Sequence, residues 1–333
     1  TETLRVRTNL VEIFKFWIEL ADLDGFRLDT VKHVEIDFWP FFNSEIRAFA
    51  TAMGKTNFIQ FGEMFDTTEA GNGRFTGTQA GGGYANDTVL NFPLYGKVGS
   101  VFASASGNTK QIEDHYNAIP ANYHPDSWMR LVNFLDNHDV RRFMHSSGAN
   151  GNTNRLQLAL SFLYTSRGIP NLYYGTEQNF NGGDDPENRE DMFDGEYEQG
   201  PSLGDNFDMT KGEYLQVARL NNFRRLYPSL RTGEHVNRWN DNDSPGLFAY
   251  SRRLMSITQE VLVVLNTAGS AQTLTNRNTI YPAGTELVNL YNTNEIIVVV
   301  STTTPPVTVQ GTSHKVFVAR NQWRPLDPVV RQQ

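Results

Sequence analysis

The segment DGFRLDTVKHV, residues 24–34, places several ionisable side chains among apolar ones. Arg27 and Asp29 are two residues apart, so an extended strand would direct both side chains to the same face. A guanidinium beside a carboxylate keeps the acid ionised even where burial disfavours the charge. The pair suits a structural ion pair, and it equally suits a carboxylate nucleophile with the cation that keeps it charged.

Polar residues follow four of the five apolar segments that we predict to be strands. They are Asp29, Lys32 and His33 after the first segment, Glu63 after the second, Asp136, Asn137, His138 and Asp139 after LVNFL, and Tyr173, Tyr174, Gly175 and Glu177 after the last. In parallel α/β folds, ligands bind at the carboxyl ends of the strands. Acidic residues at the ends of three separate strands therefore predict an active site.

The elements that must position these residues alternate between strand and helix as far as about residue 230. We predict strands at 25–31, 58–65, 88–92, 129–135 and 169–175, and helices at 8–21, 41–53, 94–102, 155–166 and 213–228. Such alternation implies a parallel sheet with helices packed on it. We expect Thr8 to cap the first helix, the Gly-rich segment 66–86 to be a loop, and Pro228 to close the last helix.

The last hundred residues have a different pattern. Short β-rich runs separated by turn residues replace the alternation, which is typical of an antiparallel β-sandwich. The sequence therefore predicts two domains, residues 1–232 and residues 233–333.

Composition excludes several classes of function. The 333-residue chain is 39% apolar and has no cysteine, so disulfides, thiolate catalysis and Cys-ligated zinc are excluded. A net charge of -8 argues against a nucleic-acid partner. No apolar run approaches a membrane span, and the opening TETLRVRTNL lacks the pattern of a signal peptide. We expect neither a nucleic acid nor a membrane as partner.

Five short motifs together resemble those of the α-amylase family of retaining glycoside hydrolases, glycoside hydrolase family 13. DGFRLDTVKH, GEMF, FLDNHD and GIPNLYYGTEQ occur in the order and approximate spacing of the family, and GGDDPENRE resembles its glucan-binding loop. The matches extend over about residues 8–230. The resemblance implies an α/β fold, namely a partial (β/α)8 TIM-type barrel with about strands 4 to 8 and their helices, followed by an all-β antiparallel sandwich.

The resemblance also implies a role for each matching residue. Asp29 would be the nucleophile, Glu63 the general acid/base, and Asp139 the third carboxylate, which grips sugar hydroxyls. The residues implied to contact substrate or to orient the nucleophile are Arg27, Lys32, His33, His138, Asp185 and Arg189. Retention needs two carboxyl groups about 5–5.5 Å apart, one ionised and one protonated. Arg27 favours the charged form of Asp29, and the apolar neighbours of Glu63 favour its neutral form.

Each of these residues also has a purely structural interpretation. Arg27 and Asp29 could form only an ion pair, Glu63 could be a solvated loop acid, and Asp185 and Arg189 could be an ordinary surface pair. The Asp-Asn-His-Asp run has suitable metal ligands, but adjacent residues in a turn rarely converge on one ion. Tyr173 and Tyr174 are more often packing residues than sugar platforms. We expect the other histidines at the surface: His115, His124, His145, His235 and His314.

The first motif is one that the family places at its fourth strand. Five strands cannot close an eight-stranded barrel. We therefore expect either the C-terminal portion of a longer enzyme or one half of an assembly whose N-terminal barrel half is a separate chain. Calcium is possible in the complete enzyme, but of its ligands in the family only His33, through its backbone oxygen, has a counterpart here.

Three hypotheses follow. The first is a hydrolase that cleaves α-1,4-glucosidic bonds of starch-like glucans through a covalent glycosyl-enzyme intermediate, in an extracellular or periplasmic setting where polymeric starch is met. The second is a glucanotransferase of the same family, in which a sugar rather than water attacks the intermediate. The third is a non-catalytic glucan-binding half that needs a complementing N-terminal part.

Overall fold

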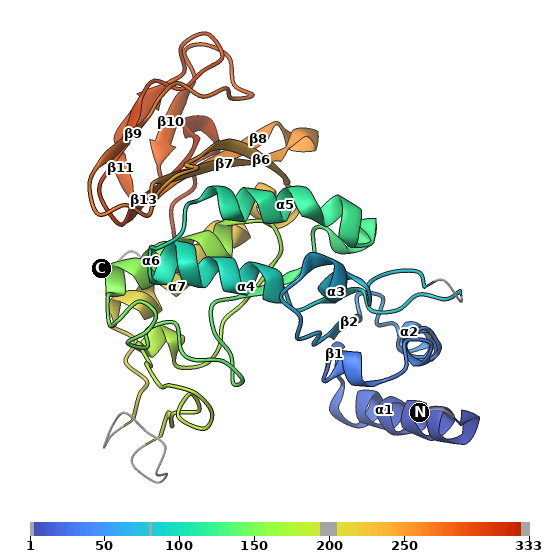
Figure 1. Ribbon diagram of the computed structural model, residues 1–333. Coiled ribbons are helices and arrows are strands. Elements are labelled where there is room, and N and C mark those ends of the chain that lie inside the picture. Colours follow the sequence, from blue (N-terminus) through green and yellow to red (C-terminus); the bar gives the residue numbers. More distant parts are fainter. Residues whose placement is uncertain (1–2, 80–81, 194–204, 328–333) are drawn as a thin grey trace. The chain divides into compact units, whose positions relative to one another are not determined.

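The computed structural model describes residues 3–79, 82–193 and 205–327 (Figure 1). The chain forms two compact units, each with its own internal packing. Unit 1 comprises Thr1–Leu94 and His115–Asn133, and unit 2 comprises Tyr95–Asp114 and Phe134–Gln333. Three elements continue from one unit into the other along the chain: α4 (Phe92–Val98), α5 (Lys110–Asn122) and β4 (Val132–Phe134).

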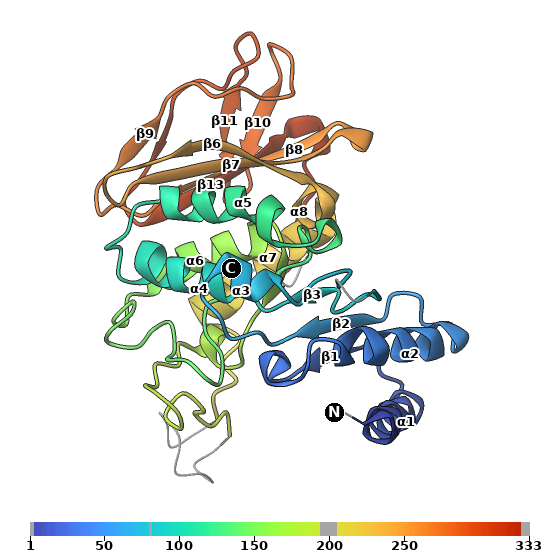
Figure 2. The ribbon, with the colours of Figure 1, turned by 45° about the vertical axis from the view of Figure 1, so that its right-hand side comes forward.

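Unit 1 is built on a parallel sheet of order β1-β2-β3. Its elements before residue 90 are α1 (Leu4–Ala21), β1 (Gly25–Leu28), α2 (Phe38–Ala52), β2 (Ile59–Gly62), α3 (Glu69–Gly73) and β3 (Thr88–Val89). Helix α2 runs alongside β1 and β2 (Figure 2). Arg27 pairs with Phe61 and Leu28 with Gly62, so the residues that follow both strands emerge at the same edge.

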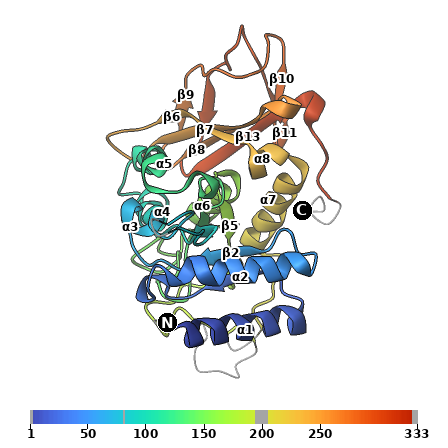
Figure 3. The ribbon, with the colours of Figure 1, turned by 90° about the vertical axis from the view of Figure 1, so that its right-hand side faces the viewer.

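Helix α1 packs along α2 (Figure 3). The ring of Phe14 meets those of Phe26 and Phe42 edge-on, with centroids 5.0 and 4.9 Å apart. The prediction that Thr8 caps this helix is wrong. The side chain of Thr3 accepts a hydrogen bond from the Val6 N–H, whereas Thr8 lies inside the helix and its hydroxyl donates to the Leu4 carbonyl.

The predicted strands are present but shorter than expected. Strand β1 ends at Leu28 because Thr30 has a positive φ of 50°, which an extended strand cannot accommodate. The predicted loop 66–86 contains the short helix α3, although its residues 80–81 lie outside the described part. Helix α5 was not predicted, because its 110–122 segment has polar residues and Pro120 in place of a clear apolar stripe.

The described residues of unit 2 form further helices and most of the strands. They are α6 (Thr153–Thr165), β5 (Ile169–Asn171), α7 (Gly212–Leu226), α8 (Pro228–Thr232), β6 (Glu234–Asn240), β7 (Leu247–Leu254), β8 (Gln259–Asn266), β9 (Gln272–Leu274), β10 (Glu286–Asn289), β11 (Asn292–Val298), β12 (Val307–Val309) and β13 (Ser313–Ala319). Helix α7 ends at Leu226, and Pro228 opens α8 at a position where its missing N–H is tolerated.

The C-terminal strands form an antiparallel sheet of order β11-β10-β13-β8-β7-β6, and β12 pairs with β9 in a second sheet (Figure 1). Side chains from both sheets share one core, including Leu247, Val264, Leu274, Val307 and Phe317. The predicted antiparallel C-terminal region is therefore present. No helix in the described ranges is long and apolar enough to cross a membrane.

The predicted boundary at residues 232 and 233 stays a prediction. Strand β6 begins just after it, at Glu234, yet residues before it in sequence pack with the C-terminal sheet. The Thr109 hydroxyl donates to the Leu247 carbonyl over 2.7 Å, and the Lys110 N–H donates to the Asp241 carbonyl over 3.0 Å. These bonds place the start of α5 within unit 2.

Candidate active site

Asp29 directly follows β1 and forms the predicted contact with Arg27. The Arg27 guanidinium donates to the Asp29 carboxylate. The Asp29 side chain is 63% exposed, although its apolar neighbours Leu28 and Val31 are buried. The strand ends one residue earlier, at Leu28, so Asp29 lies beyond the last paired residue of β1.

Glu63 follows the neighbouring strand β2 and is only 6% exposed. Its Oε2 accepts a hydrogen bond of 2.9 Å from the Thr30 N–H, and its backbone bonds to Leu28 and Val31 continue the ladder between β1 and β2. The structure thus brings the Glu63 carboxyl group next to the peptide that joins Asp29 to Thr30. An N–H donated to Oε2 leaves Oε1 as the oxygen that would carry an acidic proton.

Lys32 and His33 lie on the short 3-10 helix Val31–His33 that follows Asp29. The Lys32 ammonium donates to the Phe65 carbonyl over 2.8 Å and lies 5.6 Å from the centre of the Phe65 ring. This contact ties the residues after β1 to those after β2. His33 is exposed, and its N–H bonds to the Thr30 carbonyl over 2.9 Å.

Gly62, the last residue of β2, allows the side chains of Val31 and Asn86 to lie close to this strand end. A Cβ at this position would lie 2.7 Å from Val31 Cγ2 and 2.9 Å from Asn86 Nδ2. Asn86 belongs to a buried polar layer under the sheet, where its Oδ1 accepts from Asn43 Nδ2 over 3.1 Å. The motifs did not indicate Asn43 or Asn86, since isolated amides in sequence carry no chemical signature.

The four predicted residues of unit 2 also come together. His138 Nε2 lies 3.2 Å from Asp139 Oδ2, and Arg189 Nη2 lies 3.8 Å from Asp139 Oδ1. Arg189 Nε is 2.8 Å from Asp185 Oδ1. All four side chains are a third or more exposed, so they are open to a ligand. We call Asp139, His138, Asp185 and Arg189 the polar cluster of unit 2.

Backbone contacts fix the two segments that carry this polar cluster. The Asn188 side-chain amide donates to the carbonyls of His138 and Val140, both over 2.9 Å. Asn137 Oδ1 accepts from the Asp139 N–H over 2.8 Å. The loop around Arg189 is thereby held against the turn around Asp139.

A buried ion pair also joins the two segments that carry the polar cluster. Arg142 is fully buried, its Nε lies 2.7 Å from Glu190 Oε2, and its Nη1 donates to the Tyr174 carbonyl over 2.6 Å. Its guanidinium also stacks 4.0 Å from the centre of the Tyr173 ring. Both tyrosines thus take part in packing. The motifs did not indicate this pair, because Glu190 had no assigned role within GGDDPENRE and Arg142 lies three residues beyond FLDNHD.

Asp136 is the acid that sequence analysis noted beside Asp139, but its side chain has a different environment. Burial raises the pKa of Asp136, and the nearby Arg142 charge opposes that rise. Its oxygens accept from the Phe143 N–H over 2.9 Å and from the Thr176 hydroxyl over 2.8 Å. Asp136 therefore has a structural role, because it links the turn after β4 to Phe143 and Thr176.

The expectation that the remaining histidines lie at the surface is wrong for three of them. His115 is completely buried, with Glu69 Oε1 3.2 Å from Nδ1 and Asn91 Nδ2 3.2 Å from Nε2. Burial lowers the pKa of His235 to about 4, and it lowers the pKa of His314 to about 4. Their neighbours in sequence do not reveal this, because the covering side chains come from distant segments.

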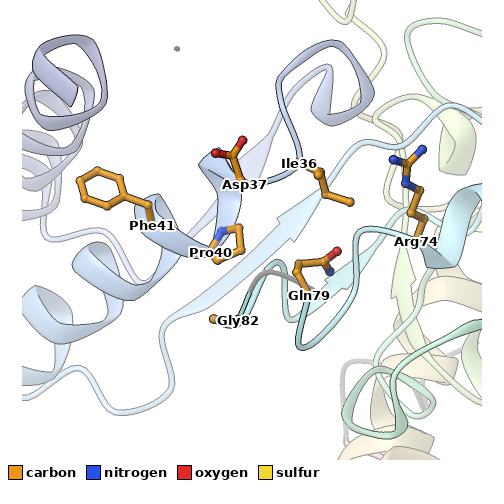
Figure 4. Close-up of a pocket in the computed structure, with 8 residues that line it drawn as sticks. Ile36, Asp37, Pro40, Phe41, Arg74, Gln79 and Gly82 are labelled. Atoms are coloured by element: carbon orange, nitrogen blue, oxygen red, sulfur yellow. The ribbon is translucent and has the colours of Figure 1, made fainter. Parts of the chain in front are cut away.

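A hollow of about 640 Å³ in unit 1 has neither Asp29 nor Glu63 in its lining (Figure 4). It is lined by Ile36, Asp37, Pro40, Phe41, Arg74, Gln79, Gly82 and Gly83. A second hollow, of about 690 Å³ in unit 2, includes Arg189 together with Tyr174, Phe193 and Phe207. Of the two, only the second includes a residue of the predicted site.

A calcium site is not evident in the residues that the structure describes. They contain no group of three or more His, Asp or Glu side chains that could hold a metal ion. The His33 carbonyl alone does not make such a site, because calcium takes six to eight oxygen ligands. We therefore assign no step of the chemistry to a metal.

Comparison with known proteins identifies the family. The chain belongs to the alpha-amylase family, whose description "Alpha amylase, catalytic domain" matches residues 1–207. It is 32% identical over 266 residues to a beta/alpha-amylase of Paenibacillus polymyxa, covering 78% of this chain and 19% of that protein. It is 30% identical to an alpha-amylase of Streptomyces lividans and to a cyclomaltodextrin glucanotransferase of a Bacillus strain. These two alignments cover 81% and 83% of this chain, but only 31% and 35% of the relatives.

Solved structures agree with this assignment. An Anoxybacillus alpha-amylase superposes with a TM-score of 0.78 at 26% identity, covering 96% of this chain and 63% of that one. The alpha-amylase of Geobacillus thermoleovorans, solved with acarbose, superposes with a TM-score of 0.76 at 25% identity. This superposition covers 96% of this chain and 65% of that one. The chain thus has the mixed helix and strand fold and the antiparallel C-terminal region of alpha-amylases, and it spans less than two thirds of these structures.

Proposed function

We propose that this chain carries the catalytic residues of a retaining glycoside hydrolase that cleaves α-1,4-glucosidic bonds of starch-like glucans. The observation that supports this most is the pair of acids after β1 and β2. Asp29 is exposed and paired with a guanidinium, whereas Glu63 is buried and bonded through Oε2 to the peptide beside Asp29. Such contrasting environments suit the two carboxyl groups of a retaining mechanism.

In the first step, Glu63 donates the proton on Oε1 to the glycosidic oxygen while Asp29 attacks the anomeric carbon. The bond from that carbon to the glycosidic oxygen breaks, and the leaving glucan departs with the proton as a hydroxyl. Arg27 donates to the Asp29 carboxylate and orients it for attack. The product is a glycosyl ester on Asp29.

In the second step, the Glu63 carboxylate takes a proton from water, and the water oxygen attacks the anomeric carbon. The ester bond breaks, Asp29 leaves as a carboxylate, and Glu63 regains its proton. Two inversions at one carbon give net retention. We assign the binding of sugar hydroxyls to the polar cluster of unit 2, whose side chains supply both charged donors and acceptors.

The remaining predictions about the complete protein are part of the same proposal. We propose that β1 to β5 correspond to about strands 4 to 8 of a (β/α)8 barrel, and that the N-terminal barrel half belongs to another segment or chain. The partial coverage of all the relatives described above supports this. We also keep the proposal of an extracellular or periplasmic enzyme, which rests on where starch polymers are met.

A glucanotransferase is the second candidate. The 30% identical cyclomaltodextrin glucanotransferase favours it, since that relative is as similar to the chain as the Streptomyces alpha-amylase is. The same acids would act, but a glucan hydroxyl would replace water in the second step. Incubation with maltoheptaose distinguishes the two, because longer or cyclic products require transfer and hydrolysis gives only shorter ones.

The assignment of Glu63 can be tested with two substrates that differ in their need for an acid. In Glu63→Gln we expect starch hydrolysis to fall by about 10²–10⁴-fold. Cleavage of α-maltosyl fluoride should fall far less in its first step, because fluoride leaves without a proton. Glu12→Gln, an exposed acid on α1, is the matched control and should retain full activity.

The protein for this test contains the whole 333-residue chain, with no added partner in one arm and with the N-terminal barrel half in the other. Equal losses on both substrates in Glu63→Gln would contradict the role of general acid. Activity of the 333-residue chain alone would eliminate the hypothesis of a non-catalytic half.

A further inference from the structure

A third hollow, of about 360 Å³, lies on the C-terminal β region and has no part in the proposed reaction. It is lined by Trp239 and Asp241 at the end of β6, by Leu247 of β7, and by β9 and the residues after it, which include Gln272, Leu274 and Arg277. Leu247 and Leu274 are buried and form an apolar floor. We call this hollow the Trp239 site.

An irregularity in β6 places Trp239 at this hollow. The pairing of β6 with β7 shifts register between Asn237 and Trp239, so β6 has an irregularity at Arg238. Arg238 turns inward, where its guanidinium bonds to Ser251 Oγ and Glu260 Oε1 over 2.8 and 2.7 Å. Trp239 pairs with Ala249, on the face of β7 that also carries Leu247, and as part of the edge strand β6 it remains 42% exposed. Such irregularities commonly re-aim a side chain.

Polar groups surround the indole and hold it in one orientation. Trp239 Nε1 donates to Asp241 Oδ1 over 3.1 Å, and Asp241 Oδ2 accepts from the Leu247 N–H over 2.6 Å. The Arg277 guanidinium lies 4.5 Å from the centre of the Trp239 ring. The indole is therefore pre-positioned, so little side-chain entropy would be lost when a ligand packs against it.

One donor in this site lacks a partner. Arg277 Nε is buried and makes no hydrogen bond to any described residue, although Nη1 of the same side chain donates to the Asn276 carbonyl over 3.0 Å. A buried N–H without a partner is unfavourable, so the free energy of the folded state does not depend on Nε alone to hold this side chain in place. The site thus combines an aromatic ring with the Arg277 guanidinium, which lines the hollow and can donate to a hydroxyl.

We propose that the Trp239 site binds a segment of α-glucan, separately from the catalytic residues. A glucose ring has an apolar C–H face that can pack on indole and a rim of hydroxyls that can accept from Arg277 and donate to Asp241. The charges of Arg277 and Asp241 offset each other, which suits a neutral polyol better than an anion or a cation. The choice of glucan, rather than another neutral sugar, rests on the proposed function.

The test measures retention of the protein on starch. Binding to starch granules and to maltoheptaose is compared in the Glu63→Gln background, so that no ligand is consumed. Trp239→Ala should weaken binding about tenfold or more, whereas Trp239→Phe, which keeps an aromatic face, should weaken it less. Trp323→Ala is the matched control, because Trp323 is also exposed, at 37%, but does not line the site.

With Glu63 intact, Trp239→Ala should leave the hydrolysis rate of a short soluble maltooligosaccharide unchanged and slow that of starch granules several-fold. Starch binding by Trp239→Ala equal to that of its parent would overturn the inference. Loss of binding to the same extent in the folded Trp323→Ala would overturn it as well. Starch bound through Trp239 by a protein without hydrolytic activity would contradict the proposed function and leave the Trp239 site standing.

Discussion

The two groups of predicted site residues are held in place by different means. After β1 and β2, the register of a parallel sheet brings Asp29 and Glu63 to one edge, and backbone hydrogen bonds do most of the positioning. In unit 2, Asp139 and Arg189 lie on irregular segments that side chains join, above all the buried pair Arg142–Glu190. The comparison teaches that a strand end needs only its register, whereas a loop needs dedicated supporting residues.

The largest expected effect is a loss of stability when the buried pair Arg142–Glu190 of unit 2 is disrupted. Arg142→Met leaves the buried Glu190 carboxylate without its cation, and we expect a loss of roughly 3–5 kcal/mol in the free energy of unfolding. Arg141→Met is the control in the neighbouring position, because its pair with Asp184 is exposed and its loss should change the free energy of unfolding far less. Urea unfolding of both variants measures the difference.

A double variant, Arg142→Met with Glu190→Leu, sharpens the interpretation. If the cost comes from an uncompensated charge, removal of both partners should recover much of the lost stability. The double variant should still bind substrate poorly, because the loop of Arg189 loses its anchor. Equal losses in Arg141→Met and Arg142→Met would show that burial of the pair does not matter.

The expected effect in unit 1 is smaller and arises from the backbone. In Gly62→Ala, the added methyl group would press on Val31 Cγ2 and Asn86 Nδ2, so we expect destabilisation by about 1–3 kcal/mol and lower activity. In Gly96→Ala, the Cβ would meet nothing within 4 Å. Because Gly96 lies in helix α4, where alanine is favoured, the substitution should leave the stability of the protein unchanged or raise it. An unchanged melting temperature and activity in Gly62→Ala would argue against the tight register.

The smallest expected effect is a dependence of the stability of unit 2 on pH. His235 and His314 of unit 2 have pKa values lowered to about 4 by burial, so above an unfolded-state pKa of about 6.5 their full stabilisation is present. Between pH 6.5 and 4 the unfolded state binds more protons, and stability falls as pH falls. From pH 7 to 5.5 we expect each histidine to lower the free energy of unfolding by about 1 kcal/mol.

Hydrogen exchange resolved by segment can check this effect. Protection of β7 and β8 should decline over this pH interval, and His235→Gln should reduce the decline. An identical pH dependence in the wild type and in His235→Gln would show that His235 does not titrate on unfolding.

The sequence predicted the residues and their order better than their surroundings. The motifs located Asp29 beside Arg27, and they selected Asp139, His138, Asp185 and Arg189, which the structure brings into contact. The catalytic roles of Asp29 and Glu63 stay predictions. The sequence did not reveal Arg142–Glu190 as a support or His115 as buried, because such environments depend on which distant segments cover a side chain.

By itself, the sequence determined the alternation of strands and helices, the change to β-rich segments near residue 232, and the identities of the charged residues in the motifs. These are local properties, set by side-chain type and spacing. Only the tertiary structure decided that β1 ends before Asp29, that Glu63 is buried while Asp29 is exposed, and that Trp239 faces a hollow beside Arg277. Exposure and contact depend on segments far apart in the chain, and no local pattern encodes them.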